Sequence, residues 1–262
     1  MYRGNYTSIA EAIQNEKAGT RILVRPGHYR ESLVIDKPLE IIGDGNRDDI
    51  VLETAGKDLV LFNASMGRMS NLTLRQRGGG LFDAVAIAQG RLDLEDCDIS
   101  SQGWAAIAIN EGADPRVRRN RIQDCKEAGI SVYASVSGII EDNEISGIGS
   151  IGIGIHDGAD PIVRRNRICD SKEHGIAVFE GGAGLIEDNE IFGNAKSGID
   201  VTDAGNPTVR GNWIRGNQVG IRVYDGGQGT FENNVLAENK RGAWDIAKDC
   251  EPNVKRSGNI ES

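Results

Sequence analysis

Apolar residues recur along this chain in short runs that do not follow the period of an amphipathic helix. The most regular run has the form Gly-Ile-x-Val. It begins at Gly129, Gly152, Gly175, Gly198 and Gly220, with steps of 23 residues and a last step of 22. Short apolar runs separated by turn residues are typical of β-strands. The pattern therefore predicts many short strands.

An asparagine column keeps the same period. Asn-x-Ile or Asn-x-Leu occurs at Asn120, Asn143, Asn166, Asn189, Asn212 and Asn234. An apolar residue stands three positions before each asparagine, so each unit holds three short apolar segments. A 23-residue unit of three strands predicts one coil of a parallel β-helix, in which counterpart strands pair about 4.8 Å apart along the axis.

The asparagine column is predicted to be structural. Identical positions of successive coils lie one above another, so a side-chain amide at a tight bend can donate to one coil and accept from the next. We therefore expect these six asparagines to form a ladder. The glycine that opens each Gly-Ile-x-Val run is expected to have a positive φ or to approach another backbone closely.

Basic and acidic coils alternate in this sequence. Pro161-Ile-Val-Arg-Arg-Asn-Arg-Ile168 is followed 23 residues later by Gly184-Leu-Ile-Glu-Asp-Asn-Glu-Ile191. Opposite charges about 5 Å apart stabilise neighbouring strands by roughly 0.2–1 kcal/mol per exposed pair. We interpret most of the charge as solvated ion pairs that lace the stack together and disfavour a slip by one coil.

A single solenoid is predicted over residues 1–262. Ser8-x-x-Glu11 is a capping box, which predicts a short helix over 8–17 that covers the first coil. The divisions predicted after it are irregular first coils at 20–100, regular coils at 101–241 and a C-terminal cap at 242–262. Both ends need a cover because exposed strand edges promote association.

Composition narrows the classes of partner. Against 30 basic residues stand 39 acidic ones, and the net charge of −9 argues against a nucleic-acid binder. No run of 18 apolar residues predicts a membrane span. The N-terminus lacks the apolar core of a secretory signal, so the sequence as it stands predicts a cytoplasmic location, or a periplasmic or secreted one if a signal was removed. The four cysteines lack metal-ligand spacing and are expected to be free thiols.

The alternating coils and the Gly-Ile-x-Val run resemble the right-handed parallel β-helix of the carbohydrate-binding and sugar-hydrolase repeat class. The resemblance is closest to the substrate-recognition β-helix of F-box ubiquitin-ligase adaptors and to NosD-like bacterial proteins. Residues 26–45 are similar to the opening of pectin methylesterase-like helices. The resemblance implies an all-β, right-handed, single-stranded parallel β-helix with three sheets, of pectin-lyase-like type, which hosts lyases, hydrolases, epimerases and binders.

In the enzymes that this class includes, catalytic groups project from the outer face of one strand column. Strand alternation points the x residue of Gly-Ile-x-Val outward. That column reads Ala86, Ala108, Ser131, Gly154, Ala177, Asp200 and Arg222. It is nearly bare, and Asp200 beside Arg222 is interpreted as a surface ion pair, with a role in proton transfer as the alternative.

Two further outward columns follow that strand. The first is a broken aromatic ladder that contains Tyr133, His156, Phe179 and Tyr224. The second is an acidic stripe that contains Asp157, Glu180, Asp203 and Asp225. Aromatic faces suit stacking against a sugar ring or a peptide side chain, and they also shield a sheet without any ligand.

The acidic stripe raises the question of metal binding. Glu111 with Asp114, and Asp157 with Asp160, offer oxygen ligands for a weakly bound Ca²⁺. The alternative is a solvated acidic edge with no cofactor. The three histidines are interpreted as single exposed residues, and about 16 Å of extended chain separates the positions of His156 and His174, so they are not expected to share one metal or one catalytic unit.

The sequence contains none of the catalytic motifs of pectin methylesterases or polygalacturonases. Its leading interpretation is therefore a non-catalytic recognition or scaffold module that binds a protein segment along the aromatic and acidic columns. The alternative is a polysaccharide-active enzyme or carbohydrate-binding β-helix for uronate-type polymers, in which Asp200, Arg222 and His156 act with the acidic stripe. No oligomeric state follows from the sequence.

Overall fold

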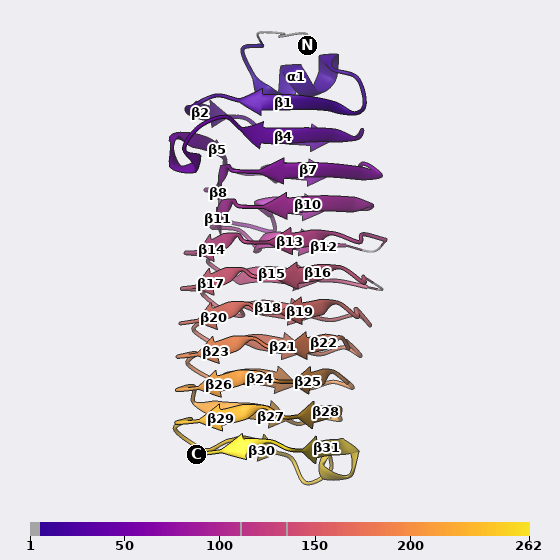
Figure 1. Cartoon of the computed structure of the whole chain (residues 1–262), viewed down its shortest axis with the longest axis vertical. Helices are drawn as coiled ribbons and strands as arrows, with labels where there is room; N and C mark the ends of the chain where they lie inside the picture. Colours follow the sequence, from indigo (N-terminus) through magenta and orange to yellow (C-terminus); the bar gives the residue numbers. More distant parts are fainter. Residues whose placement is uncertain (1–5, 111, 135) are drawn as a thin grey trace.

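The computed structural model describes residues 6–110, 112–134 and 136–262. Within them the chain winds into a stack of coils whose strands form three long parallel sheets of 11, 11 and 10 strands. Each strand pairs with its counterpart one coil away, so all three sheets run along the axis of the stack (Figure 1). The predicted all-β, three-sheet parallel β-helix is confirmed.

The sheets are named A, B and C in the order in which the chain visits them. Sheet A contains β1 (Thr20–Val24), β4 (Leu39–Gly43), β7 (Met66–Ser70), β10 (Arg91–Glu95), β13 (Arg116–Arg118), β16 (Ile139–Glu141), β19 (Ile162–Arg164), β22 (Leu185–Glu187), β25 (Thr208–Arg210), β28 (Gly229–Glu232) and β31 (Val254–Ser257). Sheet B contains β2 (Gly27–Arg30), β5 (Ile50–Thr54), β8 (Thr73–Gln76), β11 (Asp98–Ser101), β14 (Arg121–Gln123), β17 (Glu144–Ser146), β20 (Arg167–Cys169), β23 (Glu190–Phe192), β26 (Trp213–Arg215), β29 (Val235–Ala237) and β32 (Ile260–Glu261). Sheet C contains β3 (Leu33–Ile35), β6 (Val60–Phe62), β9 (Val85–Ile87), β12 (Ala105–Ile109), β15 (Ala128–Val132), β18 (Ile153–Ile155), β21 (Ile176–Val178), β24 (Ser197–Val201), β27 (Val219–Val223) and β30 (Trp244–Ile246).

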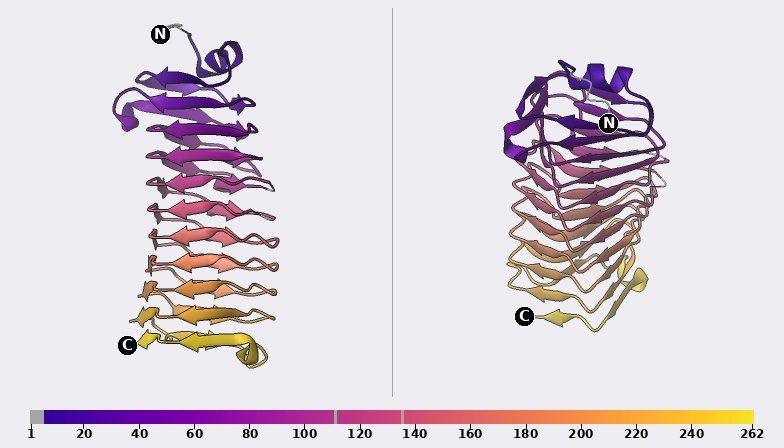
Figure 2. Two further views of the ribbon diagram at one scale, coloured as in Figure 1. Left: turned by 45° about the vertical axis from the view of Figure 1, so that its right-hand side comes forward. Right: turned by 45° about the horizontal axis from the view of Figure 1, so that its top comes forward.

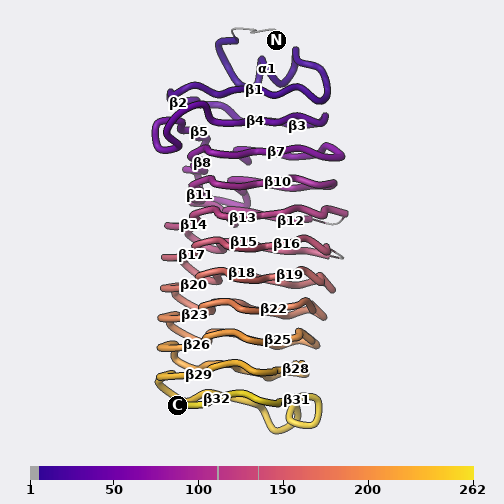
Figure 3. Tube along the Cα trace, in the orientation of Figure 1, coloured from indigo at the N-terminus to yellow at the C-terminus, as the bar shows by residue number. Residues whose placement is uncertain are grey.

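The strands stack in the register that the sequence period predicts. In sheet C, Ile130 pairs with Ile153, and Ile153 pairs with Ile176. The inward side chains of all three sheets meet in one apolar core that is buried along the whole stack. Because the register repeats, corresponding turns lie above one another from coil to coil (Figure 3).

The asparagines form the predicted ladder. Asn143 Nδ2 donates to Asn166 Oδ1 at 3.0 Å and to the Val117 carbonyl at 2.9 Å, and the Asn143 backbone N–H donates to the same Oδ1 at 3.0 Å. The pattern recurs at Asn120, Asn166, Asn189, Asn212 and Asn234. All six side chains are buried, so the ladder satisfies polar groups that water does not reach.

A second, shorter ladder lies between sheets B and C and was not predicted. Asn194 Nδ2 donates to Asn217 Oδ1 at 2.9 Å, and Asn217 Nδ2 donates to Asn239 Oδ1 at 3.2 Å. These asparagines follow the Asn-x-Ile motif by five residues in the last regular coils. The same physical requirement therefore shapes two of the bends.

The glycines that open the strands of sheet C are required by crowding. A Cβ at Gly175 would lie 2.5 Å from Ile191 Cγ2 and 2.7 Å from the Gly198 carbonyl oxygen. Gly175 and Gly198 have no left-handed φ, so of the two expected reasons for glycine only the close approach applies to them.

The charge ladder differs from the solvated ion pairs expected from the sequence. Glu141 is only 1% exposed, and its carboxylate accepts hydrogen bonds from Arg116 at 2.7 Å, Arg164 at 2.9 Å and Arg165 at 2.9 Å. Burial raises the pKa of this carboxyl, but the three guanidinium groups outweigh it and hold the pKa at about 2. Glu95 and Asp98 are buried among arginines in the same way, whereas Asp142 and Glu144 pair with arginines in solvent, as expected.

The chain itself covers the N-terminal end of the stack, and the C-terminal cap at 242–262 stays a prediction. Helix α1 (Ile9–Asn15) lies over the first coil, where Ile9, Ala12 and Ile13 are buried against β1 and β3 (Figure 2). Ser8 Oγ accepts from the Glu11 N–H at 3.1 Å, which caps the helix. A 3₁₀ turn, η1 (Arg47–Asp49), precedes β5, and a second, η2 (Glu251–Asn253), leads into β31 and β32 in the last coil.

The structure bears on two expectations from composition, the state of the cysteines and the lack of a membrane-spanning segment. All four cysteines are buried free thiols. No helix in the described ranges has the length and apolar character needed to cross a membrane.

The ladder predicts a large effect of Asn166→Ala. The substitution orphans the buried Asn143 N–H and the Ile140 carbonyl, and each orphaned group costs about 1–3 kcal/mol, so we expect the free energy of unfolding to fall by about 3 kcal/mol. Denaturant unfolding measures the change. Asn206→Ala, the same change at an exposed position, is the control and should have little effect. Equal losses in the two variants would contradict a structural role for the ladder.

Candidate functional site

The outer face of sheet C holds most of the residues that the sequence singled out. Its central column pairs Ala177 with Asp200 and Asp200 with Arg222, and small residues line it toward the N-terminal end. Ala108, Ser131 and Ala177 of this column are buried. The Phe179 ring lies close enough that a Cβ on Gly154 would be 3.9 Å from its Cε1. Larger side chains from the ends of the strands therefore cover a floor of small ones.

The aromatic ladder is continuous over three coils. The Tyr133 ring meets the His156 ring edge-on at 4.1 Å between centroids, and the His156 ring stacks on Phe179 at 4.9 Å with an interplanar angle of 4°. Thr202 interrupts the run. The next aromatic ring, Tyr224, lies under the Arg222 guanidinium, whose Cζ is 4.1 Å from the centroid of the ring. Aromatic rings held by such contacts keep a fixed surface for a ligand to stack on.

Trp104 extends this aromatic surface and was missed in the sequence. Its Nε1 donates to the Tyr133 hydroxyl at 2.6 Å. Tyr133 follows its strand and Trp104 precedes its own, so this hydrogen bond holds the Tyr133 side chain back toward the N-terminal ends of the strands. Trp104 is 43% exposed, one of the few large apolar side chains that face solvent. It precedes β12 and lies in a different repeat column from Tyr133, so the 23-residue period gave no reason to join them.

The acidic stripe forms the corner of the turn after sheet C. Asp157, Glu180, Asp203 and Asp225 all have a positive φ, between 45° and 53°. All four are exposed. Among the described residues, His156 is the only basic side chain within ion-pair distance of any of them. The His156 Nδ1 lies 3.1 Å from Asp157 Oδ2 and 3.5 Å from Glu180 Oε2. The stripe thus carries one imidazole among otherwise uncompensated carboxylates.

The predicted calcium ligands are placed differently. Asp157 lies in a group with His156 and Glu180 whose ligand atoms are all within 4.8 Å of one another, and that group does not include Asp114 or Asp160. Glu111 lies outside the described residues. Calcium binding by the paired acidic positions stays a prediction.

A second polar cluster lies at the N-terminal ends of the sheet C strands. His174 Nδ1 is 2.7 Å from Ser197 Oγ, which is 2.9 Å from Asp200 Oδ1, and Arg222 Nε donates to that same Oδ1 at 2.8 Å. His174 is 6% exposed and Asp200 is 3% exposed. Asp200 and Arg222 form the expected ion pair, but its expected place at the surface is wrong, because the carboxylate is buried. The interpretation of His156 and His174 as exposed histidines is wrong as well, since both are buried.

The short contacts assign the proton positions in this cluster. If the Ser197 hydroxyl donates to Asp200, the Ser197 oxygen can accept from His174 Nδ1–H, and every contact has one hydrogen. The reverse tautomer would leave two oxygens 2.9 Å apart without a proton between them. The Ser197 backbone N–H approaches Nδ1 at 3.4 Å, a much weaker contact than the 2.7 Å one. His174 Nε2 is therefore the unprotonated nitrogen.

Burial shifts the pKa values of His174 and Tyr133 in opposite directions. It lowers the pKa of His174 below its ordinary value, although Asp200 acts against the shift. It raises the pKa of the Tyr133 hydroxyl above its ordinary value. At neutral pH the face thus presents a neutral imidazole that can accept a proton and a phenol that can donate one.

Two carboxyl groups that the sequence did not single out adjoin sheet C at its N-terminal end. The Asp83 backbone N–H donates to Asp58 Oδ1 at 2.8 Å, and Asp83 Oδ1 accepts from the Ala105 N–H at 3.0 Å. Burial and the nearby Asp58 charge raise the pKa of Asp83 to about 7. Asp83 is therefore partly protonated at neutral pH.

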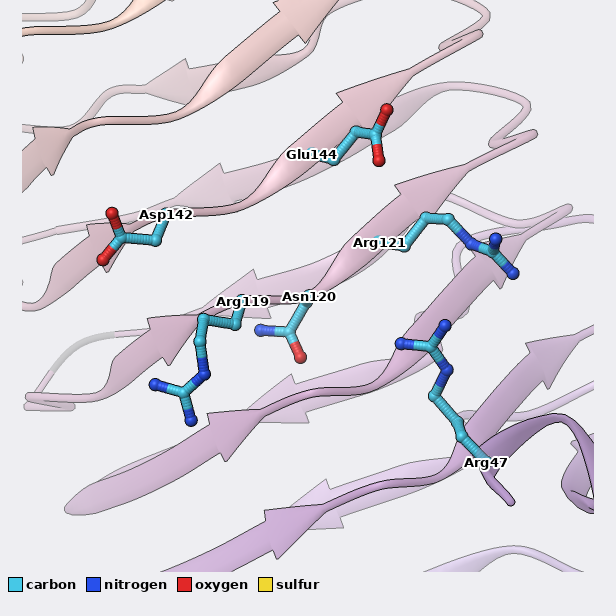
Figure 4. Close-up of a pocket in the computed structure, with 6 residues that line it drawn as sticks. All are labelled: Arg47, Arg119, Asn120, Arg121, Asp142 and Glu144. Carbon is cyan, nitrogen blue, oxygen red and sulfur yellow. The ribbon is translucent and has the colours of Figure 1, made fainter.

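A pocket of about 330 Å³ lies elsewhere, at the asparagine bend between sheets A and B. It is lined by Arg47, Arg119, Asn120, Arg121, Asp142 and Glu144 (Figure 4). Arg119 pairs with Asp96 at 2.9 Å and Asp142 pairs with Arg165 at 2.8 Å, so these groups belong to the charge lacing of the stack. The pocket brings together none of the residues predicted as catalytic or ligand-binding.

The sequence profile of the right-handed β-helix region matches residues 58–182 and, with overlap, 105–259. The chain belongs to this right-handed β-helix family. The predicted handedness of the coil is thereby confirmed. Comparison with curated proteins gives no match. The closer likeness to F-box adaptors and NosD-like proteins stays a prediction.

Solved right-handed β-helices share the fold at low identity. The A-module of a mannuronan C-5 epimerase from Azotobacter vinelandii has a TM-score of 0.72 and 16% identity, over 96% of this chain and 88% of that one. An alginate lyase from Paenibacillus has a TM-score of 0.63 and 16% identity, over 96% of each chain. An α-1,3-glucanase catalytic unit from Streptomyces thermodiastaticus has a TM-score of 0.66 and 13% identity, over 95% of this chain and 64% of that one.

The raised pKa of Asp83 predicts a pH-dependent gain of stability in Asp83→Asn. The folded state holds the proton up to about pH 7, well above the ordinary value of 3.8, so the wild type loses stability as pH rises from about 4 to about 7. The variant lacks this loss and should be more stable than wild type at pH 8 by on the order of 2 kcal/mol, with a smaller difference at pH 5. Denaturant unfolding at both pH values measures the effect, with the exposed Asp36→Asn as the control. A difference that does not change with pH would contradict the assignment.

Proposed function

We propose that this protein acts on an extended uronate-type polysaccharide that lies along the outer face of sheet C. The observation that carries the proposal is the buried chain of contacts from Arg222 through Asp200 and Ser197 to His174, which leaves one imidazole nitrogen free on the face that also carries Tyr133. A binding surface needs no such fixed tautomer, whereas a proton-transfer site does.

The chemistry that fits these groups is removal of the proton beside a uronate carboxylate. Such a step needs a base, a group that stabilises the charge developing on the carboxylate, and an acid. His174 Nε2 is the base and the guanidinium of Arg222 stabilises the carboxylate. Transfer of the abstracted proton to the departing glycosidic oxygen gives elimination, and return of a proton from solvent to the opposite face of the sugar carbon gives epimerisation.

The aromatic surface supplies a place for the sugar rings. Trp104, Tyr133 and Phe179 lie along the axis of the stack beside a floor of small residues, which suits a linear polymer more than a compact ligand. The acidic stripe beside it repels a polyanion, so we expect a divalent cation, Ca²⁺ among them, to strengthen polymer binding.

A polysaccharide partner is better supported than the protein-binding scaffold expected from the sequence. The solved β-helices of similar fold include, by their names, a mannuronan epimerase, an alginate lyase and an α-1,3-glucanase. Their identities to this chain are at most 16%, so they support the class of partner and leave the chemistry to the residues.

Activity assays on alginate and polygalacturonate, with Ca²⁺ present, test the proposal. We expect unsaturated uronide absorbance or, by proton NMR, inversion at C5 of the uronate. His174→Gln should lower turnover by roughly 10²–10⁴-fold. His28→Gln, an exposed histidine on β2, should leave turnover unchanged. Polymer binding without either product would overturn the catalytic assignment, and absence of binding would overturn the substrate class.

The lowered pKa of His174 predicts the acid limb of the pH profile. Because the neutral imidazole is the active form, turnover should fall only below about pH 6.5, the ordinary value for histidine. Ser197→Ala interrupts the contacts with Asp200 and should move that limb. An unchanged limb in Ser197→Ala would contradict the proposed role of the chain of contacts.

A further inference from the structure

We propose that His156, Asp157 and Glu180 form a binding site for a divalent transition-metal ion of the zinc class. The three residues come from two successive coils: His156 and Asp157 follow β18, and Glu180 follows β21 by two residues. The site does not rest on the proposed activity, because its geometry and charge are independent of His174 and Arg222.

The distances fit a metal ion shared by the three side chains. Zinc binds histidine nitrogen and carboxylate oxygen at about 2.0–2.2 Å, so two ligands at a tetrahedral angle lie about 3.4 Å apart. The observed separations from His156 Nδ1 are 3.1 Å to Asp157 and 3.5 Å to Glu180. All three ligand atoms lie within 4.8 Å of one another, and the half-exposed carboxylates are free to rotate and close the set.

The histidine is held in the orientation that a ligand needs. His156 is 8% exposed, its ring is stacked flat on Phe179, and Tyr133 packs against it edge-on. These contacts fix the ring plane, and Nδ1 points between the two carboxylates rather than into the core. The buried ring thus turns its nitrogen toward two exposed carboxylates.

The charge around the site favours a cation. In sheet A the acidic residues are matched by arginines one coil away, as Glu141 is by Arg164. The described part of the acidic stripe has no such arginine or lysine, and His156 is the one basic group beside the two carboxylates. A divalent ion would neutralise both.

The donor set selects the class of metal. One imidazole and two carboxylates suit Zn²⁺ and its first-row neighbours, whereas Ca²⁺ prefers six to eight oxygen ligands. The solvent-facing side of the group leaves room for water as a further ligand. This choice differs from the calcium site that the spacing of Asp157 and Asp160 had indicated.

Calorimetric titration of the whole, metal-stripped chain with Zn²⁺ alone tests the site. We expect one ion per chain and a rise in the thermal unfolding midpoint with added Zn²⁺. His156→Phe keeps an aromatic ring for the stack on Phe179 and removes the nitrogen, so it should weaken Zn²⁺ binding by at least about 100-fold. Asp157→Asn keeps a side chain that tolerates a positive φ and should weaken binding by roughly 10–100-fold.

Two matched variants serve as controls. Asp124→Asn alters an exposed aspartate that also has a φ of 53° but has no histidine beside it. His28→Gln removes an exposed histidine on β2, far from His156 in the sequence. Both should bind Zn²⁺ as the wild type does. The four cysteines are buried in the folded chain and do not compete for the ion.

The outcomes separate this site from the proposed activity. Wild-type affinity in His156→Phe would overturn the proposal, and so would the absence of Zn²⁺ binding to a folded wild type, which would leave His156 as an ion-pair partner only. Ca²⁺ binding without Zn²⁺ binding would equally overturn it and would point to the all-oxygen positions. No polymer is present in the titration, so failure of the polysaccharide proposal leaves this result unaffected.

Discussion

The hydrogen bonds between stacked asparagine side chains are the interaction on which the rest of the structure depends. Each side-chain amide accepts from a backbone N–H of the preceding coil and donates to a carbonyl of that coil, as Asn143 does with Asn120 and Val117, at a bend that water does not reach. The bend can be buried only if every coil returns to the same place. A constant period, an aligned register and columns of like residues on all three sheets follow from that requirement.

The columns also impose a rule on charge, because like charges that stack in register repel one another. Sheet A meets the rule by alternating the sign from coil to coil, to the point that Glu141 is buried beneath three arginines. The turn after sheet C does not meet it: Asp157, Glu180, Asp203 and Asp225 follow one another without alternation. A bound cation would relieve the repulsion between these carboxylates.

The outer face of sheet C departs from the regular stack in a second way. In sheet A the contacts between columns join oppositely charged groups, as Arg116 and Arg165 join Glu141. On this face such contacts join groups of other kinds: Trp104 reaches Tyr133, and Ser197, which contacts His174, reaches Asp200. Contacts between columns bring unlike groups together, which a chemical site needs and a repeated column does not supply. The polar groups with displaced pKa values, His174 and Tyr133, lie at these contacts.

The sequence by itself determined the coil, the three sheets and the principal ladder, because each depends on the residue one period away and the period is written in the spacing of Asn120, Asn143 and Asn166. It also placed the aromatic and acidic columns side by side. Only the tertiary structure decided which residues of different columns meet, and how deeply they are buried. The repeat did not predict that His174 meets Asp200 through Ser197, or that Trp104 reaches Tyr133. The direction and reach of a side chain across a sheet depend on packing between coils, which the period does not encode.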